Sequence, residues 1–183
     1  MGPNDYDIRA DRDVLRSLAR LGERGLRPTG SPQIERYRLY VWQFGGTEAA
    51  IRIERRGNRY ELTVRRRCYD ARNCGRTLDQ TRPLTRGDWT RITFRLRALN
   101  FWELPSELAK SRAQMEACPG CDLAMTTDGE AFVLEGADET RHHAVDRSNP
   151  AADHPDENDF AAICEDLMRL AGLRSLAAEA SKN

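Results

Sequence analysis

The sequence lacks a long hydrophobic run and an excess of charge of either sign. No apolar segment approaches the roughly 20 residues that a membrane-spanning helix needs, so we expect no membrane span. Arginine plus lysine and aspartate plus glutamate each number 29. Because no net field attracts a polyanion, we expect no nucleic-acid partner. Lysine occurs only at Lys110 and Lys182, so arginine-rich segments by themselves argue weakly for phosphate binding.

Sequence motifs of the common enzyme classes are missing as well. The chain has no nucleophile elbow, no His-x-x-x-His pair, no P-loop and no dinucleotide-binding glycine pattern. It also has no internal repeat. These absences favour a protein that is not an enzyme.

The length of 183 residues suits one hydrophobic core. Residues 7–24 carry apolar side chains at intervals of three and four, which predict an amphipathic helix. The glycines and prolines that follow predict a linker. We therefore expect an N-terminal helix and linker (residues 1–33), a single α+β domain (residues 34–175) and a C-terminal tail (residues 176–183).

Apolar residues alternate with polar ones in several segments of the expected domain, which is the period of a β-strand. Three early runs joined by short turns predict a meander, and two later runs predict a second hairpin. The five runs cover residues 37–42, 51–54, 60–64, 131–135 and 141–147.

A sheet of this kind needs a layer over its apolar face. Residues 85–99 predict a helix that supplies the layer, and Thr85 with Asp88 resembles a capping box. A closing helix is predicted from Phe160 to Ala171, with Gly172 as its C-terminal cap. The helix at residues 85–99 has one apolar face for the sheet, made by Trp89, Ile92, Leu96 and Leu99. The expected fold class is α+β, an antiparallel sheet packed against two or three helices.

The five cysteines leave several alternatives open. Cys68 with Cys74 and Cys118 with Cys121 could form two short-range disulfides in an oxidising compartment, with Cys164 as a buried thiol. The same four thiolates could instead hold a structural zinc ion. A thioredoxin-like role for the Cys118-x-x-Cys121 motif would need a βαβ context, and unpaired inert thiols complete the alternatives.

The second hairpin carries charged and titratable side chains. Glu135 and Arg147 lie on its two strands, and we expect them to form a structural ion pair. His142 and His143 could supply acid, base or metal-ligand groups. Neighbouring residues on a strand point to opposite faces, so at most one of the two histidines can face a given pocket.

Three further sets of residues have expected places. Arg65-Arg66-Arg67 is expected on an edge strand, where arginines oppose sheet aggregation. The tryptophans, which are Trp42, Trp89 and Trp102, are expected in the core, and an exposed one would mark a partner surface. An acidic stretch with Asp156, Glu157 and Asp159 could complement a basic partner, or it could be a solvated helix entry.

Several short motifs occur in a specific order between residues 37 and 173. They are Phe101-Trp102-Glu103-Leu104-Pro105, Asp128-Gly129, Leu134-Glu135-Gly136, His142 or His143, Asp146-Arg147, Pro150 and the leucine-rich closing helix. In this order they resemble an uncharacterised family of small bacterial proteins, many of them envelope proteins or lipoproteins. That family usually has Tyr-His where this chain has His142-His143, and an aromatic residue before its Ser-Pro pair. The resemblance implies a fold and an envelope location, and it brings no catalytic residues.

We expect a non-enzymatic protein-binding module, most concretely an immunity protein or inhibitor of a bacterial toxin or envelope enzyme. Its partner would be another bacterial protein, bound through the sheet face or the acidic stretch. The alternative is a small hydrolase that uses Glu135 with His142 or His143, or a thiol oxidoreductase that uses Cys118 and Cys121. No cofactor is expected, with structural zinc as the alternative. The location would be periplasmic or in the cell envelope if a signal peptide has been removed, and otherwise cytoplasmic.

Overall fold

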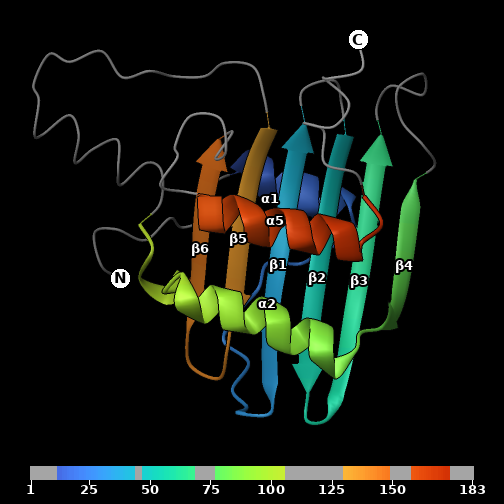
Figure 1. The fold of residues 1–183 in the computed structure, drawn as a ribbon. Helices are drawn as coiled ribbons and strands as arrows, with labels where there is room; N and C mark the ends of the chain where they lie inside the picture. Colours follow the sequence, from blue (N-terminus) through green and yellow to red (C-terminus); the bar gives the residue numbers. More distant parts are fainter. Residues whose placement is uncertain (1–11, 44–46, 69–76, 106–129, 149–157, 174–183) are drawn as a thin grey trace, which may run out of the picture.

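A computed structural model describes residues 12–43, 47–68, 77–105, 130–148 and 158–173 (Figure 1). The strands are β1 (Ile34–Gln43), β2 (Thr47–Arg56), β3 (Arg59–Cys68), β4 (Leu78–Pro83), β5 (Glu130–Ala137) and β6 (His142–Ser148). The helices are α1 (Arg12–Arg20), α2 (Arg86–Ala98), α5 (Asn158–Leu170) and the short 3₁₀ helix η1 (Phe101–Glu103). The expected α+β class with an antiparallel sheet is confirmed.

The strands form one six-stranded sheet in the order β4-β3-β2-β1-β5-β6, with every pair antiparallel. The prediction of a three-strand meander plus a hairpin was coarser than this. β1 lies at the centre, and its Leu39 is paired with Ile51 of β2 and with Leu134 of β5. The second hairpin therefore extends the meander along the other edge of β1 and belongs to the same sheet.

β4 was missing from the sequence-based expectation. Its six residues are mostly exposed and end in Pro83, so they show no alternation of apolar and polar side chains. Pairing with β3 holds the strand in place, and the hydroxyls of Thr63 and Thr81 lie 3.2 Å apart across the two strands. The expectation that Arg65-Arg66-Arg67 lies on an edge strand was wrong, because β3 runs between β2 and β4.

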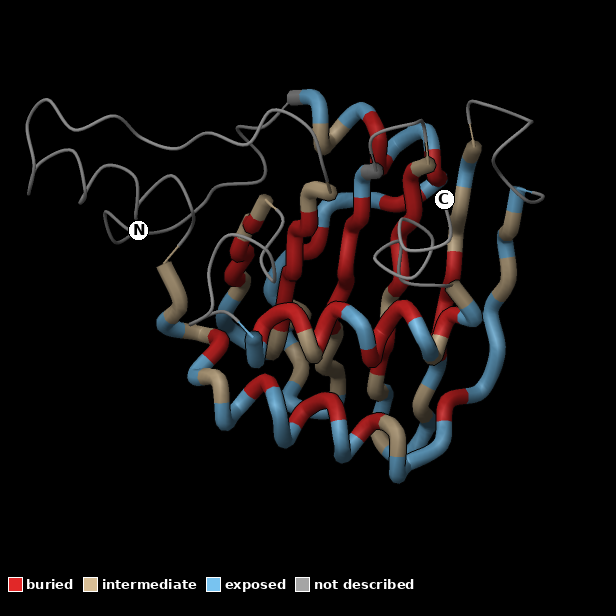
Figure 2. The backbone as a smooth tube through the Cα atoms, turned by 45° about the horizontal axis from the view of Figure 1, so that its top comes forward, coloured by how far each residue is buried: buried red, intermediate tan, exposed pale blue. Residues whose placement is uncertain are grey.

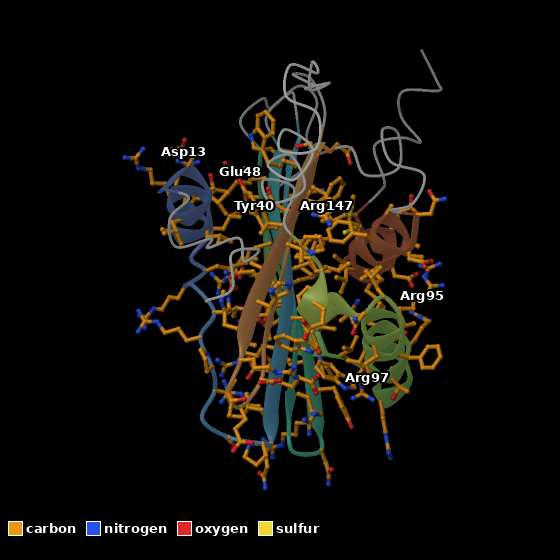
Figure 3. All side chains as sticks on the ribbon, turned by 90° about the vertical axis from the view of Figure 1, so that its left-hand side faces the viewer. Asp13, Tyr40, Glu48, Arg95, Arg97 and Arg147 are labelled. Carbon is orange, nitrogen blue, oxygen red and sulfur yellow. The ribbon has the colours of Figure 1, made fainter. Side chains whose placement is uncertain are left out.

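Helices cover both faces of the sheet (Figures 1 and 3). α2 and α5 lie side by side on one face, where Leu39 and alternate residues of the neighbouring strands form the larger apolar core. α1 lies on the other face, where its Leu18 and the following Leu21 pack with Tyr40 and Val133 in a smaller cluster. Figure 2 shows buried residues throughout the central strands and on the sheet-facing sides of α2 and α5. No described helix is long and apolar enough to span a membrane.

α2 begins and packs as its sequence predicts. The Thr85 hydroxyl accepts a hydrogen bond from the Asp88 backbone N–H at 3.0 Å, which caps the first turn. Trp89, Ile92 and Leu96 are buried against the sheet. The other predicted core tryptophans differ from Trp89, since Trp102 is half-buried and Trp42 is 38% exposed.

α5 also matches its predicted helix, and its apolar face includes the buried thiol of Cys164. Burial raises the pKa of this thiol, so Cys164 is unreactive in the folded protein. Gly172 follows the helix with φ of +69°. The left-handed conformation is typical of a glycine just past a helix C-terminus.

Gly136 is the point where η1 approaches β5. A Cβ atom on this residue would lie 2.6 Å from Cε1 of Phe101 and 3.0 Å from Cε1 of Tyr37. Only a glycine lets the Phe101 ring lie directly on the strand. The phenylalanine in turn contacts Tyr37 and Trp102 edge-on, at centroid distances of 5.9 and 5.3 Å.

The turn between β5 and β6 is organised by the carboxylate of Asp138. One oxygen accepts hydrogen bonds from the backbone N–H groups of Thr140 and Arg141, at 3.1 and 2.8 Å, and the other accepts two from the Arg141 guanidinium. Burial raises the pKa of Asp138, but these hydrogen bonds outweigh it and hold the pKa below its ordinary value of 3.8. The backbone of the same turn accepts hydrogen bonds from Thr29 and Gly30.

We expect Gly136→Ala to lower the free energy of unfolding by about 1–3 kcal/mol, because the added methyl group must displace the Phe101 ring. Urea unfolding followed by tryptophan fluorescence measures the loss. Gly25→Ala is the matched control, since a Cβ there meets nothing within 4 Å and the substitution restricts only the unfolded chain. Equal stability of the two variants would contradict the close approach.

We expect the cost of Asp138→Asn to depend on pH. A carboxylate with a lowered pKa in the folded state stabilises the protein above its unfolded-state pKa, and this contribution is lost as the pH falls through the folded-state pKa. The difference in unfolding free energy between wild type and variant should therefore shrink between about pH 5 and pH 2. Urea unfolding at several pH values tests this, and a constant difference would contradict it.

Candidate functional site

The Glu135 carboxylate lies at the centre of a buried network of charges on the α1 face of the sheet. It is fully buried, and its Oε2 accepts hydrogen bonds from Nε of Arg38, at 2.7 Å, and from Nη2 of the same guanidinium. Its Oε1 lies 3.2 Å from Nε2 of His142. Both oxygens are thus engaged by neighbouring strands, and neither faces solvent.

Arg38 is also fully buried, and it has partners beyond Glu135. Its Nη1 donates to the backbone carbonyl of Arg24 at 2.6 Å and to Oε2 of Glu23 at 3.3 Å. The guanidinium therefore joins β1, β5 and the segment that follows α1. A charge removed from water needs this number of partners, because an unpaired buried charge costs several kcal/mol.

Glu23 brings two more arginines into the network. Its carboxylate lies 3.4 Å from Nε of Arg52 and 3.4 Å from Nε of Arg65. Arg65 also donates to the Leu21 carbonyl at 3.2 Å. These contacts attach residues 21–24 to three strands, so the chain between α1 and β1 packs against the sheet. The expected boundary between residues 33 and 34 stays a prediction.

The expected ion pair between Glu135 and Arg147 is not formed. Arg147 is paired in register with Phe132, three residues from Glu135, and an odd separation along a strand places two side chains on opposite faces. Arg147 lies on the α5 face, where it donates to the Pro105 carbonyl at 2.8 Å and its guanidinium carbon is 5.5 Å from the Phe160 ring centre.

The prediction that His142 and His143 face opposite sides is confirmed. His142 contacts Glu135 on the α1 face. The His143 ring lies 3.0 Å from the Leu104 carbonyl through Nε2 and 5.2 Å from the Phe101 ring centre on the other face. His143 and Arg147 thus both bind the Phe101–Pro105 segment against β6, which gives these residues a structural role.

The remaining sequence candidates are scattered or lie outside the described residues. Asp159 is exposed in the first turn of α5, and Cys68 ends β3. Within the described ranges, no three His, Cys, Asp or Glu side chains are placed to hold a metal ion. The disulfides and the zinc site stay predictions, because Cys74, Cys118 and Cys121, like Asp156 and Glu157, fall outside those ranges.

An open groove on the outer side of α2 was missed by the sequence reasoning. Phe94 beside it is 70% exposed, although large apolar side chains are normally buried. The groove is lined by Arg86, Gly87, Thr90, Arg91, Phe94 and Arg95. A signal for it exists in the sequence, since Phe94 is two residues from Ile92 and so falls outside the stripe that Trp89, Ile92 and Leu96 form.

Ion pairs hold two of the three arginines of this groove. Arg91 donates to Oδ1 of Asp88 at 2.9 Å, one turn earlier in α2. Nη1 of Arg95 lies 2.7 Å from Oδ2 of Asp166, a buried carboxylate of α5. Figure 3 shows Arg95 beside both helices, on the side away from the sheet. The groove is therefore built on two helices that are tied together.

No protein-family model matches the chain, and its sequence has no significant match among curated proteins. Within the part of the chain that the structure describes, the candidates by geometry are the buried charge network around Arg38 and the groove beside Phe94. The network lacks access for a substrate, whereas the groove is open.

We expect Glu135→Leu to lower the free energy of unfolding by about 3–5 kcal/mol, because it leaves Arg38 buried beside an apolar side chain. The double variant Arg38→Met with Glu135→Leu should cost less than the sum of the two single variants. Urea unfolding of all four proteins measures the coupling.

The exposed pair of Arg16 and Asp13 is the matched control. Alanine substitutions there should show a coupling of about 1 kcal/mol or less, since solvent screens such pairs. A coupling between Arg38 and Glu135 as small as that of the control would contradict the structural role of the buried pair.

Proposed function

We propose that this protein is a non-enzymatic protein-binding module that acts through the outer face of α2. The exposure of Phe94 carries the proposal. Burial of an exposed aromatic side chain under a partner lowers the free energy of the complex. Aromatic residues and arginine are also enriched in protein interfaces. The groove presents Phe94 between Arg91 and Arg95 on a helix that is fixed to the sheet.

The buried charge network supports the same proposal indirectly. Glu135 with His142 was the pair suggested for hydrolysis, and Arg38 occupies Oε2 of the carboxylate while His142 contacts Oε1. A general base must reach the proton that it removes. A fully buried carboxylate with both oxygens engaged has no route to a substrate, so a hydrolase built on Glu135 and His142 gains no support from the geometry.

The more specific role is an immunity protein or inhibitor that binds another bacterial protein. The resemblance of residues 37–173 to small envelope proteins supports a periplasmic or envelope location. A rigid sheet with a fixed helical layer also suits inhibition, since a surface that does not reorganise loses little entropy on binding.

The experiment is affinity capture from the native host with the full chain and with the variant Phe94→Ala. We expect a protein that wild type retains to be lost, with an affinity at least about tenfold weaker for the variant, because the anchor of the interface is removed. Unfolding in urea should show that Phe94→Ala leaves the stability unchanged, since the side chain is exposed.

Trp42→Ala is the matched control. Trp42 is the other large apolar side chain exposed among the described residues, and it lies on the α1 face of the sheet, away from α2. Capture should survive this substitution, because Trp42 is far less exposed than Phe94. Loss of capture in this variant would instead mark Trp42 as the partner surface. Proteins retained equally by wild type and Phe94→Ala would overturn the assignment of binding to α2, and the absence of any retained protein would overturn the proposed function.

A further inference from the structure

The outer face of α2 carries an excess of positive charge, although the whole chain is neutral. The helix contains four arginines and a single acidic residue, Asp88. Three of the arginines line the groove, and no carboxylate among the described residues does so. A partner surface that covers the groove must therefore place negative charge or polar acceptors against it, since buried like charges repel.

The arginines are positioned to bind a carboxylate in addition to their present partners. Arg91 reaches Asp88 through Nη2, and Arg95 reaches Asp166 through Nη1. A guanidinium has five N–H groups in a planar fork. One contact each thus fixes the orientation of the two side chains and leaves further donors for a partner.

Besides the exposed Phe94, the groove contains a glycine, Gly87, at a helical position. It lies in the first turn of α2, where alanine would favour the helix more. A Cβ on Gly87 would meet only the Thr85 hydroxyl oxygen, at an ordinary contact distance of 3.7 Å, so packing within the chain does not require glycine. The missing side chain leaves space on the helix surface two turns before Phe94.

Resting on the protein-binding function above, we propose that this groove binds a short acidic segment of the partner protein. Carboxylates of the segment pair with Arg86, Arg91 and Arg95, and one apolar side chain of the segment packs against Phe94. The space above Gly87 and Thr90 lets the backbone of the segment approach α2 closely.

An acidic protein segment fits better than an extended polyanion. α5 lies beside α2 (Figure 1). The exposed residues of α5 include the acidic Asp159 and Glu165 as well as Arg169. A nucleic acid or an anionic membrane would extend from α2 over these carboxylates, and the like charges would repel. A short segment remains within the arginine-lined groove. Covering the Phe94 ring also requires an apolar group, which a phosphate backbone does not supply.

The test begins with selection of random twelve-residue peptides on the full-length protein. We expect the recovered peptides to be rich in Asp and Glu and to share at least one large apolar residue. Fluorescence polarisation with a labelled recovered peptide then gives Kd for wild type and variants, at low and at high salt. Binding should weaken as salt is raised, because exposed charges are screened.

Arg86→Glu is the decisive variant. Position 86 is the first residue of α2, and a carboxylate in the first turn suits the positive end of the helix dipole, so the fold is preserved. We expect Kd for the acidic peptide to rise at least tenfold. Arg59→Glu is the matched control with the same change in charge. It lies on the α1 face opposite Arg56, and we expect Kd to change less than twofold.

The outcomes separate this inference from the proposed function. Neutral or basic peptides that lose binding in Phe94→Ala, or acidic peptides that bind Arg86→Glu as tightly as wild type, would overturn the acidic partner while leaving protein binding intact. Tighter binding of a single-stranded oligonucleotide or of phosphatidylglycerol vesicles at the same arginines would also overturn it. Failure to select any peptide, together with no protein captured from the host, would overturn both.

Discussion

A guanidinium group lies buried in the middle of this sheet, and residues of β5 and of the segment after α1 compensate its charge. Arg38 is fully buried in the central strand, where a charge without partners would cost more than a small domain can tolerate. Glu135 compensates it from β5, and Glu23 with the Arg24 carbonyl does so from the segment after α1. The positions of the second hairpin and of the N-terminal segment are therefore coupled through one side chain.

The same constraint makes the two faces of the sheet different. On the α1 face, arginines and glutamates of β1, β2, β3 and β5 form ion pairs with one another and with Glu23, beneath a short helix and the segment that follows it. On the other face, an apolar core supports α2 and α5. Asp166 of α5 ties Arg95 of α2 to this layer. The result is a fixed helical surface, on which an exposed phenylalanine among arginines finds no explanation in the stability of the chain itself.

The sequence predicted most of the regular elements, because their side chains repeat with the period of the structure they form. α2 shows this best, since the sequence predicts both the buried stripe of Trp89, Ile92 and Leu96 and the cap at Thr85. β4 escaped recognition because an exposed edge strand has no buried face to mark it. The groove beside Phe94 escaped recognition because a single apolar residue outside the buried stripe has no period, and only tertiary packing decides whether it is covered.

The sequence-based prediction of an ion pair was wrong where the register between strands decides which side chains are neighbours. Glu135 and Arg147 lie on adjacent strands, yet a three-residue offset in register places them on opposite faces. Local sequence determined the strands, the helices, their caps and the alternation of His142 with His143, because these depend on period and on neighbouring residues. The tertiary structure alone decided that the hairpin joins β1, that Arg38 meets Glu23 and Glu135, and that Phe94 stays exposed. Each of these depends on which distant surface comes to lie against a residue, and such long-range pairing leaves no period in the chain.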